Sequence, residues 1–151
     1  MRPLLDIVTT VCIGLLIGTE FAVAVFINPI LRKLGAREEL RAIRLFGAKL
    51  GAAMPFWYGA SLLLLIAEAV LRHGENGCLL LIAASALWAS MIVLSIFFLV
   101  PINNRLVRTD PEAAPEPALK EAGQWDAMHR WRVVSLTTAM VCFLLGVMRA
   151  G

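Results

Sequence analysis

The sequence predicts an all-α protein, an integral membrane bundle of four antiparallel helices. Of its 151 residues, 60% are hydrophobic and only 17% are charged, and the mean hydropathy is +0.79. Four apolar stretches are long enough to cross a hydrocarbon core of about 30 Å, which takes about 20 helical residues. We expect these spans at residues 4–27, 48–71, 78–102 and 131–149 of a single domain, 1–151. This composition argues against a soluble globular fold.

The first span is expected to be a retained helix. Its apolar run is too long for the hydrophobic region of a signal peptide, and it carries Glu20 in its second half. Asn28-Pro29 is expected to end it, because a proline disfavours helical geometry in the residue before it. Gly14 and Gly18 begin a repeat of small residues every four positions, which lets membrane helices approach closely. We therefore expect contacts between copies of the chain at these glycines.

The second span is preceded by a basic segment and followed by a turn. Apolar residues recur at helical spacing between positions 32 and 49, so this segment is expected to lie along the membrane interface before the chain turns inward. Pro55 within the span must be accommodated by neighbouring groups. Glu68 and Arg72, four residues apart, predict an ion pair near the surface. The glycine-containing segment 73–77 predicts a tight turn between antiparallel neighbours.

The third span is uncharged and is expected to end near Pro101. The segment 109–117 is rich in proline and acidic residues and predicts a surface loop, with a helix restarting near Pro117. The apolar run that follows is short for a span. Arg132 and Arg149 are therefore expected to snorkel at its two ends, or the helix to pack against protein.

The distribution of charge predicts the orientation. Most Lys and Arg residues lie in the segments after the first and third spans, whereas the other side holds only Arg2, Arg72 and Arg149. By the positive-inside rule, the basic side faces the cytoplasm of a multi-pass cell-membrane protein with both termini outside. The total of 14 Lys and Arg against 11 Asp and Glu is explained by topology and anionic lipid. We expect membrane lipid, and no nucleic acid, as a partner.

Unusual polar residues gather at the cytoplasmic ends of the first, third and fourth spans, as three walls of one candidate pocket. They are Asn28, Asn103, Asn104, Trp125, His129 and Arg132. The last three stand at i, i+4 and i+7 and share one helical face. Such a face can stack on a flat ring, move a proton near neutral pH and hold an oxyanion. The alternative interpretation is an interfacial belt, with the asparagines capping freed backbone groups.

Glu20 is a further candidate, since it lies about two turns inside the Asn28 end of its helix. Ionisable groups at such depth are costly, and they usually face an interior, a cavity or a partner. Asp126 and Arg130 form a separate i,i+4 pair that is expected to be solvated.

We predict neither a metal nor an organic cofactor. Cys12, Cys78 and Cys142 are odd in number and scattered, which argues against paired redox thiols and favours packing roles. His73 and His129 fall on opposite sides of the predicted membrane, so one subunit cannot supply two histidines to a haem. Ligation of haem by a single histidine stays open. The sequence contains no HExxH, phosphate loop or dinucleotide fingerprint.

Taken together, the motifs resemble those of the anthrone-oxygenase-like family of small four-span membrane proteins. The chain has Asn28-Pro29 at the end of the first span, P-I-N-N-R-L at the end of the third, and W-x3-H-x2-R before the fourth. The resemblance covers essentially the whole chain. Some fungal members are associated with the oxidation of anthrones to anthraquinones by molecular oxygen without an obvious cofactor. Most bacterial members have no assigned activity.

The resemblance implies that five residues hold the motif positions of the family. They are Pro101, Asn103, Trp125, His129 and Arg132. Asparagine also occurs in the family where this chain has His129, so the resemblance alone does not imply an imidazole base.

The residues and the resemblance predict a cofactor-independent oxygenase for a flat phenolic or quinol-like substrate in a cytoplasm-facing pocket. The candidate catalytic residues are Glu20, His129 and Arg132, and the candidate substrate-binding residues are Asn28, Asn103, Asn104 and Trp125. The alternative function is non-catalytic binding of lipid, quinone or a partner helix.

Overall fold

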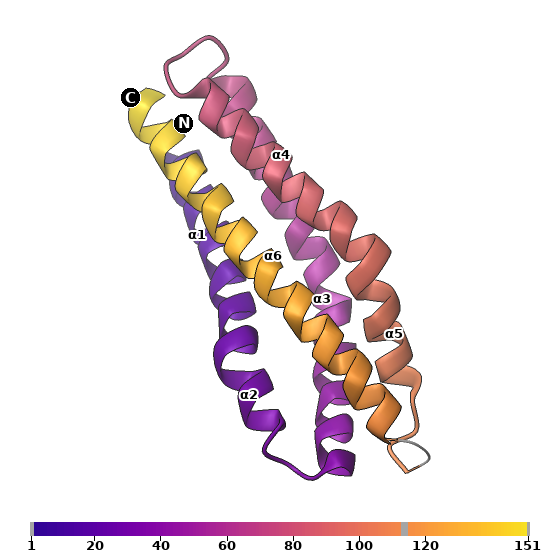
Figure 1. The fold of residues 1–151 in the computed structure, drawn as a ribbon. Coiled ribbons are helices and arrows are strands. Elements are labelled where there is room, and N and C mark those ends of the chain that lie inside the picture. Colours follow the sequence, from indigo (N-terminus) through magenta and orange to yellow (C-terminus); the bar gives the residue numbers. More distant parts are fainter. Residues whose placement is uncertain (1, 113–114, 151) are drawn as a thin grey trace.

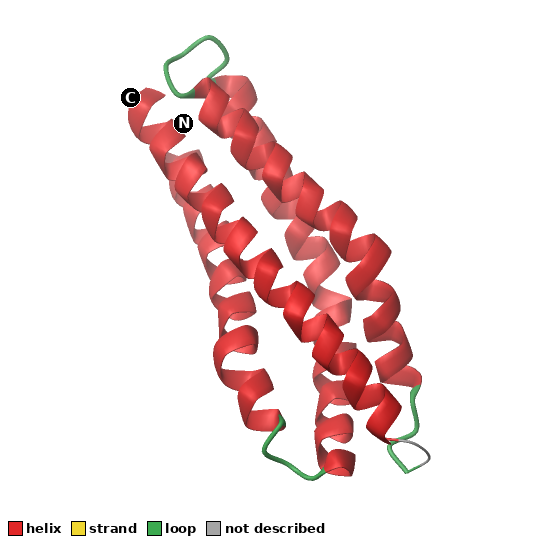
Figure 2. Cartoon of the chain, viewed as in Figure 1, coloured by secondary structure: helices red, strands yellow, loops and turns green. Residues whose placement is uncertain are grey.

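The computed structural model describes residues 2–112 and 115–150, and in this part of the chain every regular element is a helix (Figure 2). The predicted all-α class is confirmed. Within the described residues, four helical segments are long and apolar enough to cross a membrane. They are Arg2–Leu31, Ala36–Leu71, Cys78–Arg108 and Pro115–Ala150. Each predicted span lies inside one of these segments, which extends beyond it.

Two of the four segments contain a short π-helix. The first consists of α1 (Arg2–Ala22), η1 (Val23–Ile27) and α2 (Asn28–Leu31), and the second is α3 (Ala36–Leu71). The third consists of α4 (Cys78–Leu94), η2 (Ser95–Leu99) and α5 (Val100–Arg108), and the fourth is α6 (Pro115–Ala150).

Consecutive segments run in opposite directions (Figure 1). Both chain ends and the turn at residues 72–77 lie at one end of the bundle, which we call the terminal end. The connections from α2 to α3 and from α5 to α6 lie at the other end, which we call the loop end. The basic segments that follow the first and third spans therefore share one end of the molecule.

The main core lies in the half of the bundle nearer the terminal end. Its fully buried members include Ile13, Leu16, Leu65, Leu81, Ala84, Trp88, Leu136, Ala139 and Phe143. The indole of Trp88 donates a hydrogen bond to the Tyr58 carbonyl oxygen at 3.3 Å, which ties α4 to α3. In a bilayer such a core is stabilised by close packing and interhelical hydrogen bonds rather than by exclusion of water.

Pro29 does not end the first helical segment, contrary to the prediction, and Pro101 does not end the third. Each proline lies two residues after a π-helix. The Asn28 N–H bonds to the Val23 carbonyl and the Val100 N–H to that of Ser95, five residues back in each case. The wider turn shifts the hydrogen-bond register, and the proline, which has no N–H, is accommodated at the shift.

The basic segment at 32–49 does not form a separate interfacial element. The chain reverses between α2 and α3, and α3 then continues without a break from Ala36 to Leu71, through Pro55. Helical propensity therefore extends the second segment well beyond its apolar part. The described part of α6 begins at Pro115, two residues from the predicted restart near Pro117, and proline is well tolerated in a first helical turn.

The predicted turn at 73–77 is present, with φ of +84° at Gly74 and +98° at Gly77. The adjoining Glu68–Arg72 ion pair is also present, but it is buried rather than near the surface. Arg72 also binds Asp6 at 2.5 Å, and the Thr9 hydroxyl donates to Glu68 at 3.0 Å. Packing of α1 against α3 therefore covers the pair.

Candidate functional site

A cavity of about 480 Å³ lies among all four helical segments, in the half of the bundle nearer the loop end. The predicted pocket had three walls, and α3 provides a fourth. Gly47, Gly51, Pro55 and Gly59 recur every four residues on α3 and line the cavity. Small residues at this spacing leave room along one helical face. The same spacing is visible in the sequence and is the signal that the prediction missed.

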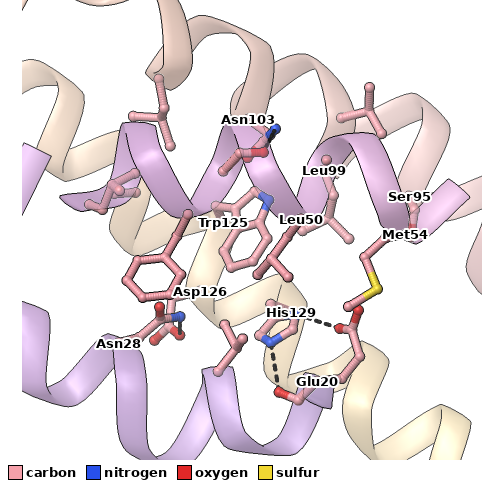
Figure 3. A pocket seen from close by; sticks show the side chains of 18 of the residues that line it. Glu20, Asn28, Leu50, Met54, Ser95, Leu99, Asn103, Trp125, Asp126 and His129 are labelled. Atoms are coloured by element: carbon pink, nitrogen blue, oxygen red, sulfur yellow. Dashed lines mark hydrogen bonds and ion pairs between the residues drawn. The ribbon is translucent and has the colours of Figure 1, made fainter. Parts of the chain in front are cut away.

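The three predicted catalytic residues meet at the wall of this cavity. Arg132 Nη2 donates to Glu20 Oε2 at 2.6 Å, and His129 Nδ1 lies 3.1 Å from the same oxygen. All three side chains are buried. Figure 3 shows His129 joined to both the carboxylate and the backbone of Glu20. The structure thus brings α1 and α6 together at Glu20, which lies 109 residues from His129 and 112 residues from Arg132 in the sequence.

The contacts of His129 define the tautomer of its neutral ring. Nε2 lies 3.1 Å from the Glu20 carbonyl oxygen, which only accepts, so Nε2 must carry a hydrogen. Nδ1 lies 3.0 Å from Arg132 Nη2, which only donates, so Nδ1 accepts from Arg132 while the ring is neutral. A proton added at Nδ1 would instead be donated to Glu20 Oε2. The imidazole therefore has partners in both charge states.

Arg132 does not snorkel to an interface, contrary to one of the two expectations for it. It is 8% exposed, because its partners lie inside the bundle. Besides Glu20, Nη1 donates to the Ser95 hydroxyl at 3.0 Å, on the first residue of η2. Its guanidinium carbon also lies 5.5 Å from the centre of the Tyr58 ring, a cation–π geometry.

Tyr58 is a site residue that the prediction missed. It is the only tyrosine in the chain, it is buried, and it lines the cavity from α3. In the described residues, the Tyr58 hydroxyl and Arg132 Nε are buried without a hydrogen-bond partner, which is uncommon in native interiors.

Trp125 and His129 form a flat stacked pair, as their four-residue spacing predicts. Their ring centres are 4.6 Å apart and their planes differ by 16°. Both line the cavity (Figure 3). The pair presents an aromatic surface next to the Glu20 carboxylate.

Asp126 is buried, which corrects the expectation that its pair with Arg130 is solvated. Asn28 Nδ2 donates to its Oδ1 at 2.7 Å (Figure 3). Its Oδ2 binds Arg32 and, at 3.2 Å, Arg130 Nε. The carboxylate is therefore satisfied by both the first segment and α6, and it holds them together at the loop end of the cavity.

The two adjacent asparagines are placed differently. Asn103 lines the cavity, and its Nδ2 donates to the Gly47 carbonyl at 3.3 Å. Asn104 is exposed and lies outside the cavity lining, which corrects its assignment to the pocket. The reason is that α5 stays helical through both positions, and consecutive residues of a helix point in different directions.

The described part of the chain shows neither a cluster of metal-binding side chains nor a disulfide. Residues 2–112 and 115–150 contain no group of three His, Cys, Asp or Glu side chains that could hold a metal ion. Cys12, Cys78 and Cys142 are free thiols of intermediate burial.

Comparison with known proteins shows the family to which the chain belongs. The family model for anthrone oxygenase matches residues 43–142, about two thirds of the chain. The chain belongs to the anthrone oxygenase family. No curated protein and no solved structure matches it.

The family resemblance drawn from the motifs is thus confirmed. The matched range of this anthrone oxygenase family member includes Asn103, Trp125, His129 and Arg132, whereas Glu20 and Asn28 precede it. The tertiary structure adds these two residues to the cavity.

Proposed function

We propose that this protein is a membrane oxidoreductase that oxygenates a flat phenolic or quinol-like substrate without a metal or an organic cofactor. The observation that carries the proposal is the buried Glu20–His129–Arg132 group at the wall of a largely apolar cavity. Membership of the anthrone oxygenase family supports the same reaction class. The loop end, with most of the basic residues, is proposed to face the cytoplasm.

The cavity suits a small aromatic substrate. Its volume of about 480 Å³ falls within the range of roughly 300 to 1,000 Å³ that is usual for small-molecule sites. The Trp125–His129 pair offers a flat surface on which a fused ring can stack. Stacking there holds the reacting carbon beside the Glu20 carboxylate, the position that proton transfer requires.

The first chemical step is removal of a proton from the activated carbon of the substrate. Glu20 and His129 act as one proton-accepting pair, because Nδ1 and Oε2 are 3.1 Å apart and can share the proton. The substrate is left as an electron-rich, enolate-like anion. The positive charge of Arg132 lowers the energy of this anion, as preorganised charges do in water-poor sites.

The anion is then oxidised by molecular oxygen. For an anthrone, a carbon–oxygen bond forms and the dioxygen unit is reduced to a hydroperoxide, which takes up the first proton. Loss of the second proton from the same carbon breaks the oxygen–oxygen bond and releases water. One anthrone and one dioxygen thus give one anthraquinone and one water. All electrons come from the substrate.

Non-catalytic binding of lipid, quinone or a partner helix is the second candidate. It is favoured by one observation, that Glu20, His129 and Arg132 are already paired with one another within the protein. Mutually paired groups of this kind also occur where a buried network only fixes helix packing.

Oxygen uptake distinguishes the two candidates. The purified protein in lipid nanodiscs is mixed with a panel of anthrones and hydroquinones, and blanks without protein correct for spontaneous oxidation. We expect protein-dependent uptake of one dioxygen for each anthraquinone formed. A panel in which no substrate gives uptake above the blank would contradict the oxygenase and leave the binding function.

A further inference from the structure

A second hollow of about 410 Å³ lies beside the cavity, between the first helical segment and α3. We call it the α1 groove. Its lining is Gly14, Leu15, Gly18, Thr19, Ala22, Val23, Ile27, Phe46 and Leu50. Leu15 and Gly18 are exposed, so the groove faces outward, within the first predicted membrane span.

The groove and the cavity adjoin each other. Four apolar residues line both, two from η1 and two from α3. They are Val23, Ile27, Phe46 and Leu50. The cavity is therefore separated from the outer surface, along the seam between η1 and α3, by apolar side chains alone. Phe46 is 44% exposed, so its ring is not fixed inside the core.

Polar contacts do not close this seam. Near the terminal end α1 is tied to α3, because Trp57 Nε1 donates to the Cys12 carbonyl at 3.1 Å and Thr9 bonds to Glu68. Beyond that level, no hydrogen bond or ion pair joins η1 or α2 to α3 in the described chain. The polar groups of Glu20 and Asn28 instead bind α6.

The loop end of the cavity has the opposite character. Asn28, Arg32 and Arg130 converge on the buried Asp126 carboxylate there. A flat apolar molecule that passed this end would separate the buried Asp126 carboxylate from its partners, and a buried charge is costly to leave unpaired. Passage through the seam displaces only apolar side chains. It also keeps the molecule out of water, where exposure costs about 25 cal/mol per Å² of apolar surface.

We propose that the seam between η1 and α3 is a lateral opening, through which a flat lipophilic aromatic molecule passes from the bilayer into the cavity along the α1 groove. The choice of ligand rests on the proposed function, whereas the route does not depend on turnover. The route therefore predicts a substrate that partitions into the membrane.

The test fills the groove without touching the cavity. A Cβ at Gly18 would meet no heavy atom within 4 Å, and Gly18 does not line the cavity, so Gly18→Phe places a ring in open space. Val11→Phe is the matched control, because Val11 is an exposed residue of the same helix outside the groove. Both variants add a phenyl ring to the lipid-facing side of α1.

Binding is followed by tryptophan fluorescence after nanodiscs that hold the protein are mixed with vesicles containing anthraquinone. Trp125→Phe identifies the part of the quenching that arises in the cavity. We expect Gly18→Phe to slow this quenching by about tenfold, since the added ring occupies the groove and must move aside. Quenching at equilibrium should be unchanged, because association and dissociation slow together. Val11→Phe should behave like the wild type.

Several outcomes would overturn the lateral opening. They are an unchanged rate in Gly18→Phe, a loss of equilibrium quenching without a change in rate, and no quenching that depends on Trp125. Lipids with brominated acyl chains can also be tested as quenchers of Trp125. If they quench it and anthraquinone does not reverse this effect, the cavity holds a lipid chain. A loss of oligomers in Gly18→Phe, with unchanged rate, would assign the groove to a second copy of the chain. A slowed rate in a protein without oxygen uptake would support the route and contradict only the oxygenase.

Discussion

Two buried glutamates in this protein show how neighbours decide the role of a side chain. Glu20 and Glu68 are both nearly inaccessible, and each binds an arginine. Glu68 is enclosed by Thr9 and Arg72 between α1 and α3 and does not line the cavity. Glu20 lies at the cavity and touches a histidine that has partners in both charge states. Only Glu20 therefore has a place to send or receive a proton.

Arg132→Lys tests whether the forked guanidinium is needed. Arg132 Nη1 donates to Ser95, and Nη2 contacts both Glu20 and His129. The single ammonium of a lysine cannot reproduce this planar arrangement. We expect a folded protein whose kcat/KM is lower by about 100-fold or more, the usual loss when one preorganised charge donor is removed. The measurement is oxygen uptake, with melting in detergent as the check on folding.

Arg72→Lys is the control for that experiment, because Arg72 is also buried against a glutamate but lies at the terminal end. It should leave kcat/KM unchanged. Equal activity in Arg132→Lys and the wild type would remove Arg132 from the proposed site.

At the residue scale, the sequence predicts the charged members of the site better than its shape. Membrane depth identifies Glu20, and helical spacing places Trp125 and His129 on one face. Tyr58 is missed because a single aromatic residue in an apolar helix carries no spacing signal. Asn104 is wrongly assigned to the pocket because the helix is expected to end near Pro101. The helix instead continues through both asparagines, and its geometry decides which of the two side chains faces the cavity.

At the scale of elements, the two π-helices shape the cavity. In each case the sequence has a proline two residues after the π-helix, and η1 and η2 both supply lining residues. Ser95, which binds Arg132, opens η2. A proline normally predicts a helix end, and the prediction for Asn28-Pro29 follows that rule. The prediction fails because the π-helix changes the hydrogen-bond register and the helix continues past the proline. No simple sequence pattern distinguishes such a proline from one that ends a helix.

Gly77→Ala tests the close approach of helices at the terminal end. Gly74 and Gly77 both have positive φ, but a Cβ at Gly77 would lie 2.4 Å from the Gly146 carbonyl oxygen, whereas one at Gly74 would meet nothing within 4 Å. Gly74→Ala should cost only the left-handed conformation, about 1 to 2 kcal/mol. Gly77→Ala should cost a further 1 to 3 kcal/mol, roughly, from overpacking.

Thermal unfolding of the two glycine variants in the same detergent measures this difference. The melting temperature should fall clearly more in Gly77→Ala. Equal shifts would show that α6 can move away from the turn at no cost.

At the scale of the whole molecule, charge is divided between the two ends of the bundle. The basic residues that follow the first and third spans lie together at the loop end, and few basic residues lie at the terminal end. Composition and hydropathy suffice to predict four helical segments, because the bilayer imposes their length. The fourth wall of the cavity is harder to predict, since it depends on how α3 packs rather than on its hydropathy.

Cysteine labelling tests the proposed orientation. Asp110→Cys, between α5 and α6 at the loop end, should be protected from a membrane-impermeant thiol reagent in intact cells, because the positive-inside rule places it in the cytoplasm. Asn76→Cys, in the turn at the terminal end, should be labelled. The wild-type chain corrects for its three native cysteines. The reverse pattern would turn the bundle over and move the cavity to the other side of the membrane.

The central claim is that the Glu20 carboxylate takes part in proton transfer, and the most direct measurement compares Glu20→Gln with Glu68→Gln. Each substitution removes a carboxylate that pairs with a buried arginine, and loss of such a partner typically costs about 3 to 5 kcal/mol. Both variants should therefore be less stable, and Glu68→Gln should lose less because Arg72 keeps Asp6 as a partner. Oxygen uptake is then measured on the folded, membrane-inserted fraction of each. Glu20→Gln should lose activity by about 100- to 10,000-fold, the usual contribution of a general base, and Glu68→Gln should keep it. A fully active Glu20→Gln protein would contradict the claim and leave the carboxylate with a structural role.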